Sequence, residues 1–119
     1  MTSLTPLHDV ESLDAAIAES RERPVLLFKH SRHCGTSFEA LDELQAHIET
    51  APTGSAAYKM ITVQTHRSVS DAVSQRFGVR HETPQAILLR DGKVIWKASH
   101  FRITASDLDD LLSSTSPSL

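Results

Sequence analysis

A run of four consecutive apolar residues, Val25–Phe28, constrains most strongly how this chain can fold. The run is too short for a helix and lies between polar segments, which is typical of a central strand buried on both faces of a sheet. Beyond Cys34 the apolar residues recur at helical spacing, and Tyr58–Val63 then predicts a second strand. Residues 25–63 are therefore expected to form a βαβ unit with parallel strands.

Three further helices are predicted by capping residues that precede apolar residues at helical spacing. The predicted caps are Asp9 before a helix over residues 10–20, the capping-box-like segment Ser68–Asp71 before a helix that Gly78 closes, and Thr104–Asp107 before the last helix. Residues 4–7 are compatible with a short edge strand, because an edge strand tolerates the proline in this segment.

Two apolar runs, Ala86–Leu89 and Val94–Trp96, flank Asp91-Gly92, and this pattern predicts a tight β-hairpin. Two parallel strands followed by an antiparallel hairpin, with helices on both faces, indicate an α/β chain with a thioredoxin-like fold and a central mixed four-stranded sheet. We expect one domain over residues 1–112 and a disordered C-terminal tail over residues 113–119.

Composition excludes several classes of protein. The 119 residues are 39% hydrophobic and 23% charged, as in an ordinary globular domain, and the net charge of −3 argues against nucleic acid or an anionic membrane as a partner. No apolar stretch is long enough for a transmembrane helix or a signal-peptide core. The single cysteine excludes an internal disulfide and a multi-cysteine zinc site. We therefore expect a monomer in the cytoplasm.

Cys34 is the main candidate for chemistry, because it lies where the buried strand gives way to a helix. The free N–H groups and the positive dipole end of a helix favour a thiolate, and Arg32 and His33 add positive potential. Ser37, one helical turn on, is expected to turn its hydroxyl toward the sulfur. The alternative is that Cys34 is a small buried hydrophobe, but the polar residues on both sides of it favour a reactive thiol.

Thr83-Pro84 precedes the predicted strand Ala86–Leu89. A proline there is ordinarily a strand-edge or loop residue. In a thioredoxin-like fold, however, this is the position of a cis-proline that faces the reactive cysteine, and Thr83 then offers its backbone to an extended partner. The predicted substrate-binding residues are Thr83, Pro84, Arg32, Gly35 and Thr36.

The seven histidines raise the alternative of a metal site. His30, His33 and Cys34 could bind a metal together with His81 or His100, but this set has neither a helical register nor a second cysteine. We therefore predict no metal. We expect His33 to tune the thiol and His47 to be an exposed or partly packed helix residue.

Five segments together resemble the monothiol bacilliredoxin family, also called bacillithiol-system redox-active proteins. These segments are Phe28–Ser31 followed by Cys34-x-x-Ser37, His66-Arg67-x-Val-Ser70, Phe77–Val79, His81-Glu-x-Pro-Gln85 and Trp96-x-Ala-Ser-His100-x-x-Ile-Thr104. The resemblance extends over about residues 9 to 112, and its specificity lies in the combination of segments.

This resemblance implies a thiol-disulfide oxidoreductase with a thioredoxin fold and a role in thiol homeostasis. Its implied substrates are cytoplasmic client proteins capped by bacillithiol, a low-molecular-weight thiol that acts as cosubstrate, and no cofactor is bound. Cys34 would attack the bacillithiol sulfur and release the protein thiol. Bacillithiol would stay on Cys34 until a second thiol removes it, because the chain has no internal resolving thiol.

Two alternatives remain open at this stage. Gly35-Thr36 departs from the family, in which proline often follows the cysteine, and Cys-Gly-Thr-Ser is similar to the Cys-Gly-Phe-Ser of monothiol glutaredoxins, which hold a 2Fe–2S cluster. Those proteins carry a Gly-Gly pair where this chain has the hairpin turn Asp91-Gly92, which disfavours the cluster. The other alternative is a binding or adaptor module that uses Thr83-Pro84 as a peptide platform without turnover.

Overall fold

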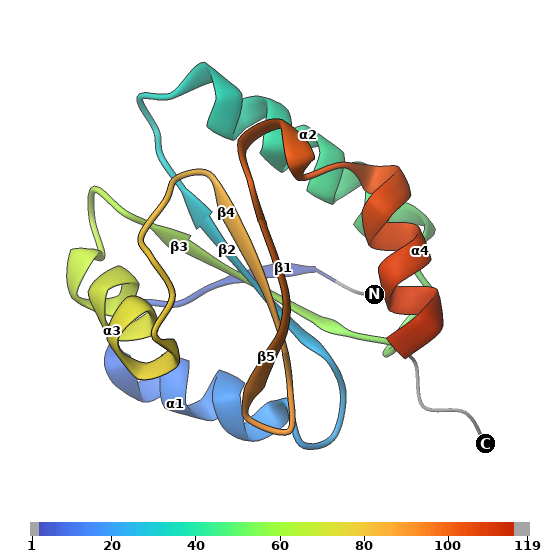
Figure 1. Cartoon of the computed structure of the whole chain (residues 1–119), viewed down its shortest axis with the longest axis horizontal. Helices are drawn as coiled ribbons and strands as arrows, with labels where there is room; N and C mark the ends of the chain where they lie inside the picture. The colour runs from blue at the N-terminus through green and yellow to red at the C-terminus, as the bar shows by residue number, and fades with distance from the viewer. Residues whose placement is uncertain (1–2, 116–119) are drawn as a thin grey trace.

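Strand β2 (Val25–His30) lies at the centre of a five-stranded mixed sheet with the order β1-β3-β2-β4-β5 (Figure 1). The computed structural model describes residues 3–115. The other elements are β1 (Leu4–Pro6), α1 (Val10–Glu19), α2 (Gly35–Thr50), β3 (Ala57–Thr62), α3 (Arg67–Phe77), β4 (Gln85–Arg90), β5 (Lys93–Ser99), the 3₁₀ helix η1 (His100–Arg102) and α4 (Ala105–Thr115). Strands β1, β3 and β2 run parallel, whereas β4 and β5 are antiparallel to their neighbours.

The predicted thioredoxin-like α/β fold is confirmed, with one strand more than the four expected. Residues Leu4–Pro6 pair with β3, and the Leu7 N–H extends that pairing by donating to the Met60 carbonyl at 2.9 Å. Strand β2 is also longer than its apolar run, because Lys29 and His30 continue the ladder as buried residues. A polar residue can therefore belong to a central strand when its side chain finds partners.

The helix boundaries follow the predicted caps with two differences. Asp9 and Ser12 form a capping box at α1, and the Thr104 hydroxyl accepts the Asp107 N–H at the start of α4. Helix α3 begins at Arg67, one residue before the expected box, and the side chain of its N-cap residue, His66, makes no capping hydrogen bond to the helix. Helix α4 continues to Thr115, past the expected domain end, and residues 116–119 of the expected tail lie outside the described residues.

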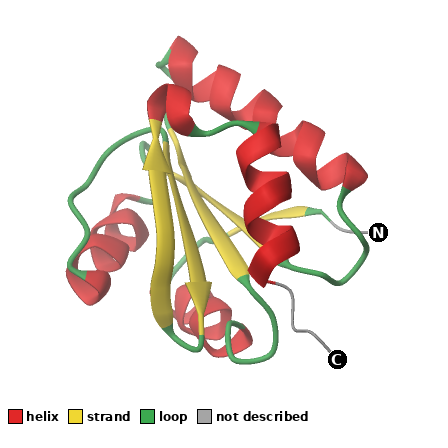
Figure 2. Ribbon diagram, turned by 45° about the vertical axis from the view of Figure 1, so that its right-hand side comes forward, coloured by secondary structure: helices red, strands yellow, loops and turns green. Residues whose placement is uncertain are grey.

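The two faces of the sheet have separate cores, and β2 contributes alternate residues to each. Val25 and Leu27 pack with residues of α1 and α3, whereas Leu26 and Phe28 pack with residues of α2 and α4. Figure 2 shows the two helix layers on opposite sides of the strands. By the same alternation, the last two residues of β2 send their side chains to opposite faces.

In the described part of the chain, no helix is both long and apolar enough to cross a membrane.

Candidate functional site

Cys34 is the N-cap residue of α2 and directly follows the loop that leaves the carboxyl end of β2. Its backbone is extended, with φ −119° and ψ 118°, and its side chain is half-buried. The Cys34 carbonyl accepts the N–H groups of Ser37 and Phe38 at 3.1 and 3.3 Å. The first N–H groups of a helix have no carbonyl within the helix to bond, so the N-terminal end of α2, where Cys34 lies, carries a partial positive charge.

The Ser37 hydroxyl bonds the end of β2, and no hydrogen bond joins it to the Cys34 sulfur among the described residues, so its expected turn toward the sulfur stays a prediction. Ser37 is fully buried, and its Oγ accepts the Ser31 N–H at 2.9 Å and contacts His30 Nδ1 at 2.8 Å. One hydroxyl satisfies both groups when it donates its proton to His30 Nδ1. Ser37 therefore fixes the loop that carries Cys34.

His30 is the imidazole packed under the cysteine helix. Burial lowers the pKa of His30, and the positive charge of Arg32 lowers it further. The ring of Phe38 meets the His30 ring edge-on at a centroid distance of 4.8 Å. A neutral His30 can accept the Ser37 proton, so the low pKa and the hydrogen bond support the same arrangement.

The residues next to Cys34 in sequence are exposed or half-buried. His33, expected to tune the thiol, is exposed, and its backbone N–H contacts Ser31 Oγ at 3.4 Å. Within residues 3–115, its ring has no hydrogen bond or ion pair. Gly35 opens the helix, and half-buried Thr36 lines a cavity of about 340 Å³ between α2 and η1. Arg32 is exposed, and its positive charge acts on His30.

Gln64 holds the cysteine loop from the other side and was not predicted from the sequence. Its amide Nε2 donates to Ser31 Oγ at 2.7 Å, and its Oε1 accepts the Arg32 N–H at 3.1 Å. Gln64 follows β3, so the loops after two neighbouring parallel strands are joined side by side. A glutamine two residues beyond a strand carries no distinctive pattern in a single sequence.

The Thr83-Pro84 peptide bond is cis, as the fold resemblance implies. Gln85 pairs with Lys29 in the antiparallel ladder, so Pro84 lies level with His30 at the end of β2. Thr83 is half-buried and shares a cavity wall with Ser31, three residues before the cysteine. The structure thus brings the predicted Thr83-Pro84 segment and the cysteine loop to the same edge of the sheet.

Lys29 is a fully buried lysine on the opposite face of the sheet from His30. Its Nζ donates to Ser74 Oγ at 2.9 Å and lies 3.2 Å from His81 Nδ1. Burial lowers the pKa of Lys29 to about 8, although the charge of Asp71 opposes the change. Burial also lowers the pKa of His81, as do Lys29 and Arg67, so His81 is suited to accept from the lysine.

The metal alternative receives no geometric support, because the described residues contain no group of three or more histidine, cysteine or acidic side chains placed to hold an ion. The two predicted loop histidines also diverge. His30 points under α2 to Ser37, whereas His33 is exposed.

Comparison with known proteins agrees with this geometry. A family model for monothiol bacilliredoxin BrxC matches residues 5–108 of the chain. A solved structure described as an oxidoreductase with a thioredoxin fold has a TM-score of 0.79 and 26% identity, covering 90% of this chain and 91% of that chain.

Two thioredoxins share the fold at lower identity. A thioredoxin of Malassezia sympodialis has a TM-score of 0.77 at 13% identity, covering 98% of this chain and 94% of that one. A mutant thioredoxin of Halobacterium salinarum NRC-1 has a TM-score of 0.71 at 21% identity, covering 100% and 99%.

Proposed function

Because the chain belongs to the monothiol bacilliredoxin family, whose model matches residues 5–108, we propose that it removes bacillithiol from mixed disulfides on cytoplasmic proteins through Cys34. Family membership supports the general part of this proposal, a thiol redox role for a protein with a thioredoxin fold. The site supports Cys34 as the nucleophile, because it is the only cysteine in the chain and is the N-cap residue of α2.

The proposed reaction is one thiol-disulfide exchange. The Cys34 thiolate attacks the bacillithiol sulfur, a new disulfide forms between Cys34 and bacillithiol, and the old disulfide breaks. The electron pair of the broken bond leaves on the client sulfur, which takes a proton from water. A second thiol then attacks the adduct and returns Cys34 to its reduced form, since the chain has no other cysteine to do so.

The surrounding residues have positioning roles in this proposal. Ser37 and Gln64 hold Ser31 and Arg32, and thereby hold the loop that places the sulfur at the helix end. Arg32, His33, Gly35 and Thr36 flank Cys34 in the sequence, and Thr83-Pro84 offers backbone groups to an extended client segment in this proposal. We therefore expect Cys34 alone to form a covalent bond.

The observation that carries the proposal is a half-buried thiol, the only one in the chain, at the N-terminus of a 16-residue helix. Each feature has a chemical consequence. Partial exposure admits a small disulfide, the helix end favours the thiolate, and the absence of a second cysteine requires an external resolving thiol.

Intact-protein mass spectrometry tests the proposal with a client peptide whose single cysteine is capped by bacillithiol. We expect the protein to gain one bacillithiol and the peptide to lose one. Cys34→Ser should abolish the transfer while leaving the circular dichroism spectrum unchanged, since serine also suits an N-cap position. A peptide that stays capped, or a disulfide between protein and peptide as the main product, would contradict the proposal and favour the adaptor alternative.

A further inference from the structure

A polar cavity of about 230 Å³ lies beside the cysteine loop, between that loop and helix α3. Ser31 and Thr83 form its wall toward Cys34, and the remaining lining residues come from the β3–α3 segment and the loop before β4. These residues are Val63, Gln64, Arg67, Ser70, Asp71 and His81. The cavity is thus built from the same loops that position the sulfur.

Two charged side chains line the cavity without an ion-pair partner among the described residues. Arg67 and Asp71 are both exposed, and neither makes an ion pair with any residue between 3 and 115. Although the two lie one helical turn apart, they do not pair with each other within 4.0 Å. An arginine in a concave polar site presents a planar fork of donors, which matches a carboxylate.

A third charge lies behind the wall of the cavity. Lys29 contacts His81, a lining residue, and two of its three ammonium hydrogens are used by Ser74 and His81. Gln85 pairs with Lys29 across the ladder, and its buried Oε1 is without a hydrogen-bond partner among the described residues. Lys29 and Gln85 are not among the residues that line the cavity, so the charge of Lys29 reaches it only from behind its wall.

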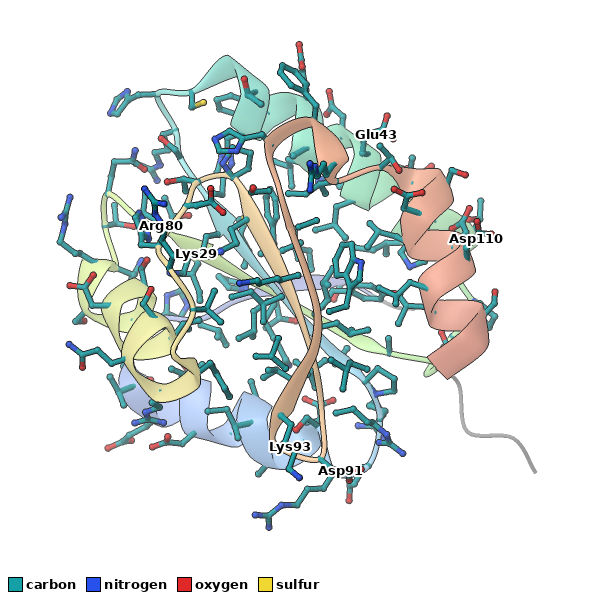
Figure 3. All side chains as sticks on the ribbon, viewed as in Figure 1. Lys29, Glu43, Arg80, Asp91, Lys93 and Asp110 are labelled. Atoms are coloured by element: carbon teal, nitrogen blue, oxygen red, sulfur yellow. The ribbon has the colours of Figure 1, made fainter. Side chains whose placement is uncertain are left out.

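Charges of both signs surround His81 at this cavity. Burial is the main cause of the lowered pKa of His81, the positive charges of Lys29 and Arg67 lower it further, and Asp71 and Glu82 oppose them. Figure 3 shows Lys29 and Arg80 on the α3 side of the sheet, whereas Glu43 and Asp110 lie on the side of α2 and α4.

The cavity on the other side of the cysteine helix has the opposite character. It lies between α2 and η1 and is lined by Glu39 and Glu43, together with Phe101, whose side chain is 75% exposed. A carboxylate would meet two like charges there, so the two cavities offer it unequal environments.

We propose that the cavity between the cysteine loop and α3 binds a carboxylate of the small thiol whose sulfur is captured by Cys34, with Arg67 as its direct partner. Lys29 supports the site from behind His81, and Ser70 and Thr83 offer neutral hydrogen bonds at its wall. This inference rests on the proposed function in one respect, namely that the captured sulfur belongs to a small thiol. It adds that the protein distinguishes small thiols by their charge.

The test uses one reporter peptide capped by two matched thiols, N-acetylcysteinylglycine and its C-terminal amide. These caps have the same sulfur chemistry and differ only in one carboxylate. We expect the wild-type protein to remove the cap with the carboxylate about tenfold faster than the cap with the amide. A charge-assisted hydrogen bond between arginine and carboxylate would give a difference of this size. The measured quantity is the ratio of the two second-order rate constants.

Three variants sharpen the test. Arg67→Ala should bring the ratio close to one, and Asp71→Asn should raise it by about two- to threefold, because a repelling charge is removed. Arg21→Ala is the matched control, because this exposed arginine follows α1 at the opposite end of β2. It should leave the ratio unchanged.

The outcomes separate this inference from the proposed function. A wild-type ratio near one, or a ratio that Arg67→Ala leaves unchanged, would overturn the carboxylate site even if the protein removes bacillithiol. Conversely, a protein that opens the two model caps with the expected ratio but leaves a bacillithiol-capped peptide intact would refute the proposed function alone. If Arg21→Ala lowered the ratio of the rate constants as much as Arg67→Ala does, the preference would come from the total charge of the protein, and the proposed carboxylate site would be wrong.

Discussion

Helix α2 has a buried histidine network at each end, and the two networks differ in what they leave unsatisfied. At the C-terminal end, His47 is 3% exposed and lies 2.8 Å from the Tyr58 hydroxyl and 2.5 Å from Asp109 Oδ1. Both ring nitrogens are used when Nδ1–H donates to Asp109 and Nε2 accepts from Tyr58. At the N-terminal end, the His30–Ser37 bond supports a loop whose thiol remains half-buried.

This difference distinguishes buried polar groups that stabilise the fold from buried polar groups that are suited to a functional site. His47 joins α2, β3 and α4, and its partners use both ring nitrogens, as is typical of a structural network. The sheet end near Cys34 instead holds Lys29, whose ammonium retains one hydrogen, and Gln85, whose buried oxygen has no partner in the described part of the chain. Unused capacity of this kind near a thiol is suited to a ligand.

His47→Ala should have the largest effect on stability. The change removes a buried ring and leaves the Tyr58 hydroxyl and Asp109 without their shared partner, so the free energy of unfolding should fall by about 3–4 kcal/mol. Urea denaturation measures the loss. The rate of bacillithiol transfer in native buffer should stay within about twofold of wild type, because His47 lies at the other end of α2 from Cys34. A large loss of rate with little loss of stability would show that the two networks are coupled.

Tyr58 should make stability fall at high pH. Burial, together with Asp109, raises the pKa of Tyr58 to about 12 from 10.0. Between these values the unfolded chain has lost the phenolic proton and the folded chain has kept it, so the free energy of unfolding should decrease by up to about 3 kcal/mol as pH rises from 10 to 12. Tyr58 is the only tyrosine, so Tyr58→Phe should remove this decrease, as measured by denaturant midpoints across that range. An unchanged decrease would assign it to other groups.

Lys29, which bonds Ser74 and His81 on the α3 side of the sheet, should change stability with pH in the opposite direction. The folded chain releases the Lys29 proton near pH 8, whereas the unfolded chain holds it to about 10.5. In this window the unfolded chain binds more protons, so the free energy of unfolding should rise with pH. We expect a gain of about 2 kcal/mol over this window.

Lys29→Met should flatten the rise between pH 8 and 10.5, and the exposed residue Lys97 supplies the matched control Lys97→Met, which should not. Denaturant midpoints at four pH values are sufficient. A rise that survives in Lys29→Met would show that the buried lysine is not its source.

The sequence predicted the layout of the fold because its signals are local. The apolar run Val25–Phe28, the hairpin turn Asp91-Gly92 and the capping residue Asp9 each act through neighbouring residues, and each element appears where it was expected. Strand β1 was ambiguous because three residues carry little periodicity, and its pairing with β3 depends on residues more than 50 positions away.

The site was predictable in its nucleophile but not in its hydrogen bonds. The position of Cys34 follows from the strand-to-helix junction, whereas the direction of the Ser37 hydroxyl depends on His30 and Ser31, both of which it bonds. His47 was expected to be exposed or partly packed, and it is buried because Tyr58 supplies a partner from β3. Such contacts join residues far apart in sequence, and the sequence alone does not place them.

Ser37→Ala should have the smallest effect, and its pattern tests whether the hydroxyl positions the cysteine loop. The variant leaves the Ser31 N–H and His30 Nδ1 without their shared partner, so the free energy of unfolding should fall by about 1 kcal/mol and transfer from a bacillithiol-capped peptide should slow by about fivefold. Ser20→Ala is the matched control, because Ser20 is an equally buried serine whose hydroxyl bonds the Ile17 carbonyl and the Gly92 N–H at the other end of the sheet. It should lose similar stability and keep the wild-type rate. Equal slowing in both variants would mean that the rate follows overall stability, whereas a complete loss of transfer in Ser37→Ala would mean that the hydroxyl acts on the sulfur itself.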